Sequence, residues 1–272
     1  MQIIAKKSLG QNFLKSEGAL RKIIEAGQIE SVDTVLEIGP GLGALTEKIL
    51  EKAGKVIVVE KDDRLIDTLK EKFSVFVSNG KLQIIHADIL DFDPISYKLL
   101  ANSYKLIANI PYYITGEIFR KFLQSDFQPK LMVILVQKEV AVRTIARDNK
   151  GSLLSNSINC YGIPKLIDTV PAGAFVPAPN VDSAILAIYD ISKKFFAENN
   201  ISEENFFAVL HAGFAHKRKM LLGNLKEWLQ KEGRTGSEKL QQVFAAGDLS
   251  PKIRAEDLSL KKWAQLVKNL DI

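Results

Sequence analysis

The sequence is poor in cysteine and histidine, and this excludes two common kinds of site. Cys160 is the single cysteine among 272 residues, so no internal disulfide can form. A chain without disulfides fits a reducing, cytoplasmic location. Three histidines beside one cysteine provide no zinc-ligand cluster, and we therefore expect a protein without a metal site.

Long apolar runs are also missing. No segment approaches the ~20 consecutive apolar residues that a membrane-spanning helix needs, so we expect no membrane association. The first residues lack the apolar core and cleavage site of a secretory signal. Hydrophobic residues make up 46% of the chain and charged residues 25%, which excludes a disordered or collagen-like protein. The sequence reveals no oligomer interface, so a monomer is the default expectation.

The first 190 residues alternate short β-branched runs with longer amphipathic stretches. The predicted strands are Thr34–Ile38, Lys55–Glu60, Leu82–His86, Lys105–Asn109 and Lys130–Gln137. The predicted helices are Gly43–Lys52, Asp62–Phe73, Thr115–Leu123 and Lys138–Asn149. This alternation is typical of βαβ units and predicts an α/β fold with a doubly wound, Rossmann-like parallel sheet. Two further strand-like runs, Ser157–Ile163 and Ser183–Tyr189, flank the proline-rich loop Val170–Asp182 and are candidates for an antiparallel edge.

After Asp190 the strand-like runs stop and helical patterns take over. The predicted helices are Glu203–Ala215, Lys217–Gln230, Ser237–Ala246 and Ala255–Leu270. We therefore predict two domains, an α/β domain over 1–190 and a small all-helical domain over 191–272. The helical part holds 14 basic and 10 acidic residues, a net charge of +4, against 23 basic and 22 acidic residues before it. This excess permits nucleic-acid binding without demanding it.

A glycine-rich loop follows the first predicted strand of the sheet. The stretch Val-Leu-Glu-Ile-Gly-Pro-Gly-Leu-Gly-Ala covers residues 35–44, and Gly39 and Gly41 allow a sharp turn and a close approach by a ligand. Glu60 ends the next strand about 20 residues later, where an acid can hold ribose hydroxyls. The spacing also matches the dinucleotide pattern Gly-x-Gly-x-x-Ala. A nicotinamide or flavin cofactor and S-adenosylmethionine are therefore both candidates.

Three features favour S-adenosylmethionine. Glu37 precedes the loop where the dinucleotide motif has an apolar residue, and Pro40 removes a backbone N–H that a pyrophosphate would use. Asp88 follows the third strand and can accept a hydrogen bond from an adenine amino group. S-adenosylmethionine carries a ribose, an adenine and a cationic sulfonium but no phosphate. Acids at successive strand ends suit it better than they suit a dinucleotide.

The fourth predicted strand ends in Asn109-Ile110-Pro111-Tyr112, on the side of such a sheet where ligands bind. The exocyclic amine of adenine is a weak nucleophile because its lone pair is delocalised into the ring. The side-chain oxygen of Asn109 and the backbone oxygen of Ile110 can accept its two N–H groups, and Tyr112 can stack on the base. Methyl transfer makes the amine cationic and acidic, so no charged general base is needed. The motif indicates methylation by positioning and electrostatics.

Three more motifs accompany the glycine loop and Asn-Ile-Pro-Tyr, in this order along the chain. They are Lys-Ser-Leu-Gly-Gln-Asn-Phe-Leu over 7–14, Phe-x-Pro-x-Pro-x-Val-Asp-Ser over 175–183 and Phe-Ala-His-Lys-Arg-Lys-Met-Leu over 214–221. With them the chain resembles the KsgA family of ribosomal RNA adenine N6,N6-dimethyltransferases from residue 6 to near the C-terminus. The resemblance implies S-adenosylmethionine as methyl donor. It implies two adjacent adenines near the 3′ end of 16S rRNA, in the 30S subunit, as substrate.

The resemblance also implies roles for individual residues. The expected cofactor-binding residues are Asn12, Leu14, Gly39, Gly41, Glu60, Asp88 and Asn109. Asn109, Tyr112 and Phe175 are expected at the reacting base, with Phe175 on the opposite face of the adenine from Tyr112. Base–aromatic stacking contributes roughly 1–3 kcal/mol per base. The cations expected to neutralise RNA phosphates are Lys217, Arg218 and Lys219, although such a run is also typical of a solvated helix start.

Three competing functions follow from the same residues. Erm-type enzymes, which methylate large-subunit rRNA, share the fold and the Asn-Ile-Pro-Tyr motif. A ribosome-assembly factor could keep the fold and act by binding alone, although intact Glu60, Asp88, Asn109 and Tyr112 argue against lost activity. An NAD-dependent oxidoreductase would need a proton-transfer residue, and the sequence does not identify one.

Overall fold

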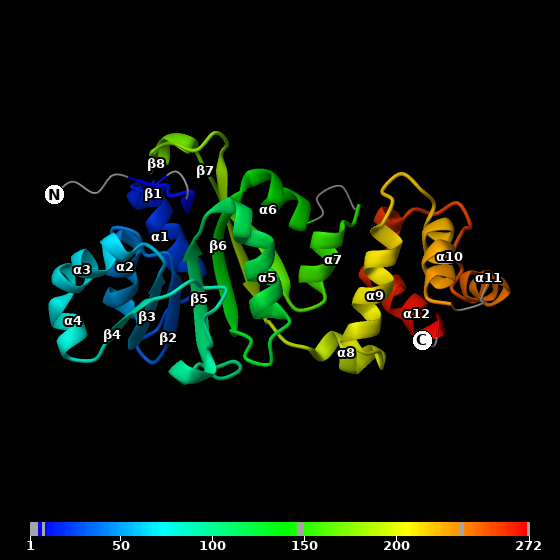
Figure 1. Ribbon diagram of the computed structural model, residues 1–272, viewed down its shortest axis with the longest axis horizontal. Helices are drawn as coiled ribbons and strands as arrows, with labels where there is room; N and C mark the ends of the chain where they lie inside the picture. Colours follow the sequence, from blue (N-terminus) through cyan, green and yellow to red (C-terminus); the bar gives the residue numbers. More distant parts are fainter. Residues whose placement is uncertain (1–4, 7–8, 146–149, 234–236, 271–272) are drawn as a thin grey trace. The chain divides into compact units, whose positions relative to one another are not determined.

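The computed structural model describes residues 5–6, 9–145, 150–233 and 237–270 (Figure 1). The chain divides into two compact units, one of residues 1–141 and 163–191 and the other of residues 142–162 and 192–272. The division therefore falls at about residue 190, but residues 142–162, which the sequence places in the α/β part, group with the helical unit. Among the described residues, no helix is both long enough and apolar enough to cross a membrane.

The first unit is built on a seven-stranded sheet with the strand order β4-β3-β2-β5-β6-β9-β7 (Figure 1). The strands are β2 (Thr34–Ile38), β3 (Lys55–Glu60), β4 (Leu82–His86), β5 (Tyr104–Asn109), β6 (Leu131–Gln137), β7 (Ile163–Val170) and β9 (Ser183–Tyr189). The first five run parallel, and β9 pairs antiparallel with both β6 and β7. The doubly wound sheet, its five parallel strands and an antiparallel edge are thus confirmed. Central strands such as β6 read as continuous apolar runs because both of their faces are buried.

Helices connect the strands of this unit. They are α1 (Glu17–Ala26), α2 (Ala44–Lys52), α3 (Asp63–Lys72), α4 (Ser74–Ser78) and α5 (Thr115–Leu123). A sixth helix, α6 (Lys138–Thr144), follows β6; its predicted end falls among residues 146–149, which lie outside the described part. Helix α1 is not among the helices predicted from the sequence; the Ser16 hydroxyl caps its N-terminus by accepting the Ala19 N–H.

The prediction of a strand over Ser157–Ile163 was wrong. Its first residues, up to Asn159, belong to helix α7 (Leu153–Asn159), a turn follows, and the edge strand β7 begins only at Ile163. A capping box between Ser152 and Ser155 starts the helix and satisfies its first N–H groups. Ile158 and the following Cys160 are buried inside the second unit, so their apolar character marks a helix end and not a strand.

A two-residue strand pair holds the N-terminal arm, and the sequence did not reveal it. Strand β1 (Phe13–Leu14) pairs antiparallel with β8 (Phe175–Val176). The Lys15 N–H continues this ladder by donating to the carbonyl of Ala174 at 2.8 Å. Residues about 160 positions apart in the sequence are thereby placed side by side.

The second unit is helical. Besides α7 it contains α8 (Lys194–Asn199), α9 (Glu203–Phe214), α10 (Leu221–Lys231), α11 (Ser237–Ala246) and α12 (Leu260–Leu270). Its core includes the fully buried Trp263 of α12, which stacks on Phe214 at 5.7 Å between ring centroids. Gly213 permits this approach, because a Cβ there would lie 2.4 Å from the Trp263 ring. The predicted helix Lys217–Gln230 begins only at Leu221, and the residues before it form a turn.

Candidate active site

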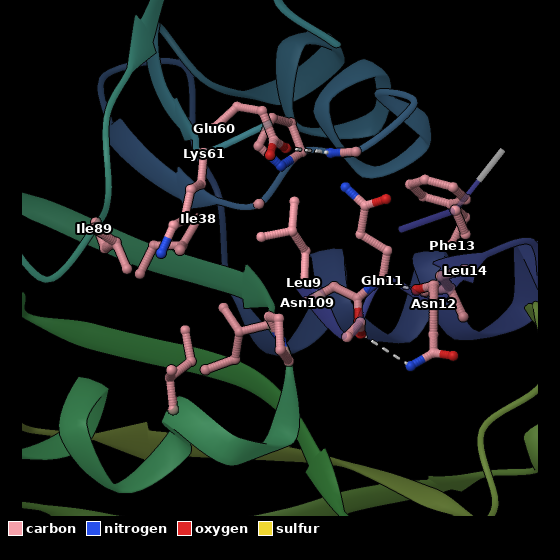
Figure 2. A pocket seen from close by; sticks show the side chains of 18 of the residues that line it. Leu9, Gln11, Asn12, Phe13, Leu14, Ile38, Glu60, Lys61, Ile89 and Asn109 are labelled. Carbon is pink, nitrogen blue, oxygen red and sulfur yellow. Dashed lines mark hydrogen bonds between the residues drawn. The ribbon is translucent and has the colours of Figure 1, made fainter. Parts of the chain in front are cut away.

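A cavity of about 1090 Å³ opens at the carboxyl ends of the parallel strands (Figure 2). The loops after β2, β3, β4 and β5 line it, together with the N-terminal arm and residues 176–177. Every residue expected to bind the cofactor lines this cavity: Asn12, Leu14, Gly39, Gly41, Glu60, Asp88 and Asn109. Four loops meet there because the strands that precede them run parallel and end on one edge of the sheet.

The glycine loop needs its glycines for two reasons. Gly39, Gly41 and Gly43 have φ values of +66°, +58° and +78°, a region that side-chain-bearing residues rarely adopt. In addition, a Cβ on Gly41 would lie 2.9 Å from the Phe13 ring of the arm. The loop therefore bends sharply and allows the arm to pack directly against its backbone.

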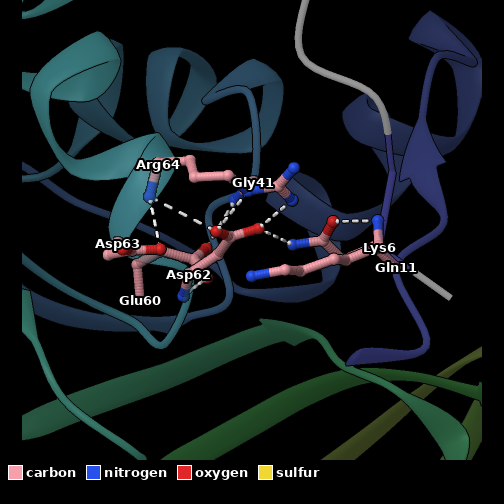
Figure 3. A network of polar contacts seen from close by, with 7 residues as sticks. All are labelled: Lys6, Gln11, Gly41, Glu60, Asp62, Asp63 and Arg64. Atoms are coloured by element: carbon pink, nitrogen blue, oxygen red, sulfur yellow. Dashed lines mark hydrogen bonds and ion pairs between the residues drawn. The ribbon is translucent and has the colours of Figure 1, made fainter. Parts of the chain in front are cut away.

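Glu60 is held in place by backbone donors. One carboxylate oxygen accepts the Gly41 N–H at 3.2 Å, and the other accepts the Asp62 N–H at 2.8 Å (Figure 3). Burial raises the pKa of Glu60, and these N–H groups oppose the rise by stabilising the charged form. The carboxylate is thus fixed at the end of β3, with lone pairs still available to a hydroxyl donor.

Asp88 lies in the loop after β4 and carries a charge. Its Oδ2 is 2.6 Å from the Lys61 ammonium, and its Oδ1 accepts the Leu90 N–H at 3.0 Å. The hydrogen bond from Lys61 lowers the pKa of Asp88 against the opposing effect of burial. Ile89, which is buried, lines the cavity beside it and offers an apolar surface to a flat ring (Figure 2).

Asn109 joins the end of β5 to the arm. Its side-chain nitrogen donates to the backbone carbonyl of Asn12 at 3.3 Å, while the Asn12 side chain donates to the carbonyl of Gly10 at 3.2 Å (Figure 2). Because the amide nitrogen of Asn109 is engaged with the arm, its amide oxygen is the group left to accept from an amine. This is the orientation that its expected role requires.

The two expected aromatic residues differ in their placement. Tyr112 lines the cavity half-buried, and its hydroxyl lies 2.5 Å from that of Ser183. Phe175 is only 2% exposed and belongs to the hydrophobic core, where it pairs with Leu14 across β1 and β8. Its neighbours Val176 and Pro177 line the cavity in its place. The structure therefore brings Tyr112 to the site and keeps the Phe175 ring in the core.

These positions can be compared with known proteins. Residues 3–271 match the family model described as ribosomal RNA adenine dimethylase. The chain belongs to this family. It is 44% identical to the ribosomal RNA small subunit methyltransferase A of Dehalococcoides mccartyi (strain CBDB1), over 96% of this chain and 87% of the relative. The protein of that name from Fusobacterium nucleatum is 36% identical over 98% of both chains.

Solved structures agree with the family. A dimethyladenosine transferase from Plasmodium falciparum superposes with a TM-score of 0.80 at 25% identity, over 95% of this chain and 97% of its own. The 23S rRNA methyltransferase ErmE gives a TM-score of 0.74 at 21% identity, over 96% and 100%, which shows the same fold. The predicted family, the methyltransferase-like sheet and the C-terminal helices are confirmed.

The family's sequence signature pointed to the arm, but the contacts of Gln11 were missed. The Gln11 amide nitrogen donates to an Asp62 carboxylate oxygen at 2.8 Å, and its oxygen accepts the Lys6 N–H at 2.8 Å (Figure 3). Arg64 also binds the buried Asp62 and holds the pKa of that carboxyl well below its usual range. Lys7 and Ser8 of the same motif lie outside the described residues. The arm is thus tied to the turn that follows Glu60.

Glu37 was also left out of the expected site. Glu37 is among the residues that line the cavity, its side chain is 1% exposed, and neither carboxylate oxygen forms a hydrogen bond of normal geometry among the described residues. Burial raises its pKa to about 8, although the neighbouring Thr46 hydroxyl opposes the rise, and the charge of Glu60 adds to it. The sequence contains a signal for this residue, because an acid within the apolar run over 35–38 is costly to bury. Such a position suggests a carboxyl that binds a ligand.

The expected RNA-binding cations lie in the second unit. Lys217, Arg218 and Lys219 are exposed in the turn between α9 and α10, which rules out a helix start as their setting. Lys219 forms an ion pair with Glu227, 2.7 Å from its carboxylate.

Proposed function

We propose that this protein transfers methyl groups from S-adenosylmethionine to N6 of two adjacent adenines near the 3′ end of 16S rRNA, two to each adenine. The observation that carries the proposal is one cavity shared by Glu60, Asp88, Asn109 and Tyr112. The names of its relatives, ribosomal RNA small subunit methyltransferase A, support the small subunit as the source of the substrate.

The cavity suits S-adenosylmethionine better than a dinucleotide. We infer that its acids bind three different parts of the molecule: Glu60 the ribose hydroxyls, Asp88 the adenine amino group, and Glu37 the cationic α-amino group of the methionine. A buried carboxyl without a partner is costly, and an ammonium ion that pairs with it offsets that cost. When bound, S-adenosylmethionine would supply a methyl group that its positively charged sulfur makes electrophilic.

The protein's own contribution is to position the acceptor. The amide oxygen of Asn109 and the backbone oxygen of Ile110 accept the two N–H groups of the adenine amine, which draws its lone pair out of the ring. Tyr112 stacks on the base and holds the nitrogen in line for transfer. The carbonyl dipoles also stabilise the positive charge that develops on this nitrogen. The amine then loses a proton to solvent, so the site needs no charged base.

RNA recognition is assigned to the second unit. The exposed cations of the α9–α10 turn can neutralise phosphates regardless of base sequence, and residues 191–272 carry most of the chain's excess charge. Base selection then belongs to the cavity, which a target adenine enters only after leaving its stack.

The test is methyl transfer from radiolabelled S-adenosylmethionine to unmethylated 30S subunits, with 50S subunits in parallel and mass spectrometry of the product nucleoside. Dimethyladenosine in 30S alone is the expected result. Label in the large-subunit RNA would assign the protein to the Erm-type activity. No label in either, with cofactor binding intact, would favour an assembly factor. Asn109→Ala should abolish the label while the protein stays folded.

A further inference from the structure

Tyr112 makes a contact that the proposed reaction does not yet use. Its side chain follows Pro111 into the short 3-10 helix over Tyr112–Ile114, and its hydroxyl reaches across to the sheet. There it shares a hydrogen bond with the Ser183 hydroxyl, with 2.5 Å between the oxygens. Ser183 is fully buried and is the first residue of β9. The tyrosine ring is therefore held at both ends, by its own backbone and by a strand from another part of the chain.

Ser183 is paired with a neighbouring strand on each side. It is opposite Gln137 in β6 on one side and Val170 in β7 on the other. The preceding residue, Asp182, accepts the Lys138 N–H on its carbonyl at 3.0 Å and the Ala172 N–H on its carboxylate at 3.1 Å. A hydroxyl on such a strand provides a fixed anchor.

The ring of Tyr112 needs an anchor for a physical reason. The rotation of an aromatic ring about its Cβ–Cγ bond is only loosely restricted, and a single 3-10 turn gives little backbone support. Stacking, in contrast, requires a defined ring plane relative to the base. A hydrogen bond to the hydroxyl fixes the direction of the ring axis, because the oxygen lies on that axis. Since a phenol O–H prefers to lie in the ring plane, a partner held by the buried strand also restrains the rotation of the ring about the axis.

We propose that Ser183 is a positioning residue: its hydroxyl fixes the ring plane of Tyr112, so that the target adenine is stacked in the orientation that methyl transfer requires. The inference rests on the proposed function, since it assigns Tyr112 to the base. It predicts that Ser183 and the Tyr112 hydroxyl act as one unit. Removing either should disorient the base to the same extent, and removing both should cost no more than removing one.

The experiment is a double-mutant cycle of Ser183→Ala and Tyr112→Phe on unmethylated 30S subunits. Active enzyme is counted by S-adenosylhomocysteine binding, so that misfolded protein does not enter the rate. Each single variant should lower kcat roughly 2- to 10-fold, the range of one hydrogen bond, with KM for 30S and the Kd of S-adenosylhomocysteine nearly unchanged. The double variant should match the single variants. Tyr104→Phe is the control, because it removes a buried hydroxyl that donates to the Phe127 carbonyl at 2.7 Å, away from the cavity; it should leave kcat unchanged.

Two results would overturn the inference. One is a double variant whose loss is the product of the two single losses, because the groups would then act independently. The other is a folded Ser183→Ala enzyme with the kcat of the unaltered protein. Should Ser183→Ala fail to fold, Tyr112→Phe decides alone, and unchanged kcat would reject the proposal. Failure of the proposed function has a different signature, since the unaltered protein would then produce no dimethyladenosine in 30S.

Discussion

Glu37 should make the stability of the protein fall as the pH rises. In the folded protein its pKa is about 8, against 4.5 for an ordinary glutamate, because burial disfavours the charged carboxylate more than the nearby Thr46 hydroxyl stabilises it. Between these values the folded state holds a proton that the unfolded state has lost. The free energy of unfolding therefore falls with pH, by about 1.4 kcal/mol per unit for one proton. Over the whole interval this amounts to about 5 kcal/mol, and the loss ends above pH 8.

The sign is opposite to that of a salt-bridged acid, whose stabilisation is lost as the pH falls. The perturbation is Glu37→Gln, which preserves the shape of the side chain and removes its titration. We expect urea unfolding, followed by circular dichroism at pH 5, 6, 7 and 8, to show a shallower pH dependence for the variant than for the unaltered protein. The comparison of slopes matters, because a buried amide has a cost of its own at every pH. Parallel slopes over pH 5–8 would refute the reasoning.

The same carboxyl should link cofactor binding to protons. If Glu37 pairs with a cationic amino group, it must ionise on binding, so S-adenosylhomocysteine should bind more tightly as the pH rises from 6 towards 8. Calorimetry in two buffers of different ionisation enthalpy measures the released proton directly. Glu37→Gln should abolish that release. A full proton released by the variant would mean that another group titrates on binding.

Three other substitutions test the rest of the site. Glu60→Ala should weaken S-adenosylhomocysteine binding by about 10- to 100-fold in calorimetry, the range for a hydrogen bond to a charged group, and an unchanged Kd would remove Glu60 from the site. Gly41→Ala should weaken the same binding because its Cβ would collide with the arm, whereas Gly80→Ala, also at positive φ but with nothing within 4 Å, should cost stability alone; equal Kd values for the two variants would contradict this. Replacing the three cations of the α9–α10 turn by glutamate should weaken 30S binding. The slope of log K against log salt concentration should become shallower by about one unit for each phosphate that is no longer neutralised. The exposed Lys52→Glu is the control. If the triple variant has the same slope as this control and as the unaltered protein, the turn does not contact RNA.

Local patterns in the sequence were enough to predict the parallel sheet. The strands over 34–38, 55–60 and 82–86 have the bounds that their short apolar runs predict. The reason is clearest for 55–60, a strand buried almost throughout, whose residues 56–59 are all apolar. The catalytic side of the sheet followed as well, since loops at the carboxyl ends of parallel strands meet at one edge. The segment over 157–163 shows the limit of this reasoning: a short apolar run fits a buried strand and a buried helix end equally well.

The remaining features depend on contacts between distant parts of the chain. The pairing of Leu14 with Phe175 and the hydrogen bond of Tyr112 with Ser183 each join residues that no local pattern relates. The sequence by itself determined the family, the parallel strands and the chemistry of the residues at the carboxyl ends of those strands. Tertiary structure alone decided which of those residues face the cavity. It buried the Glu37 carboxyl beside this cavity and kept the Phe175 ring in the core, because burial and orientation are set by what packs around a side chain.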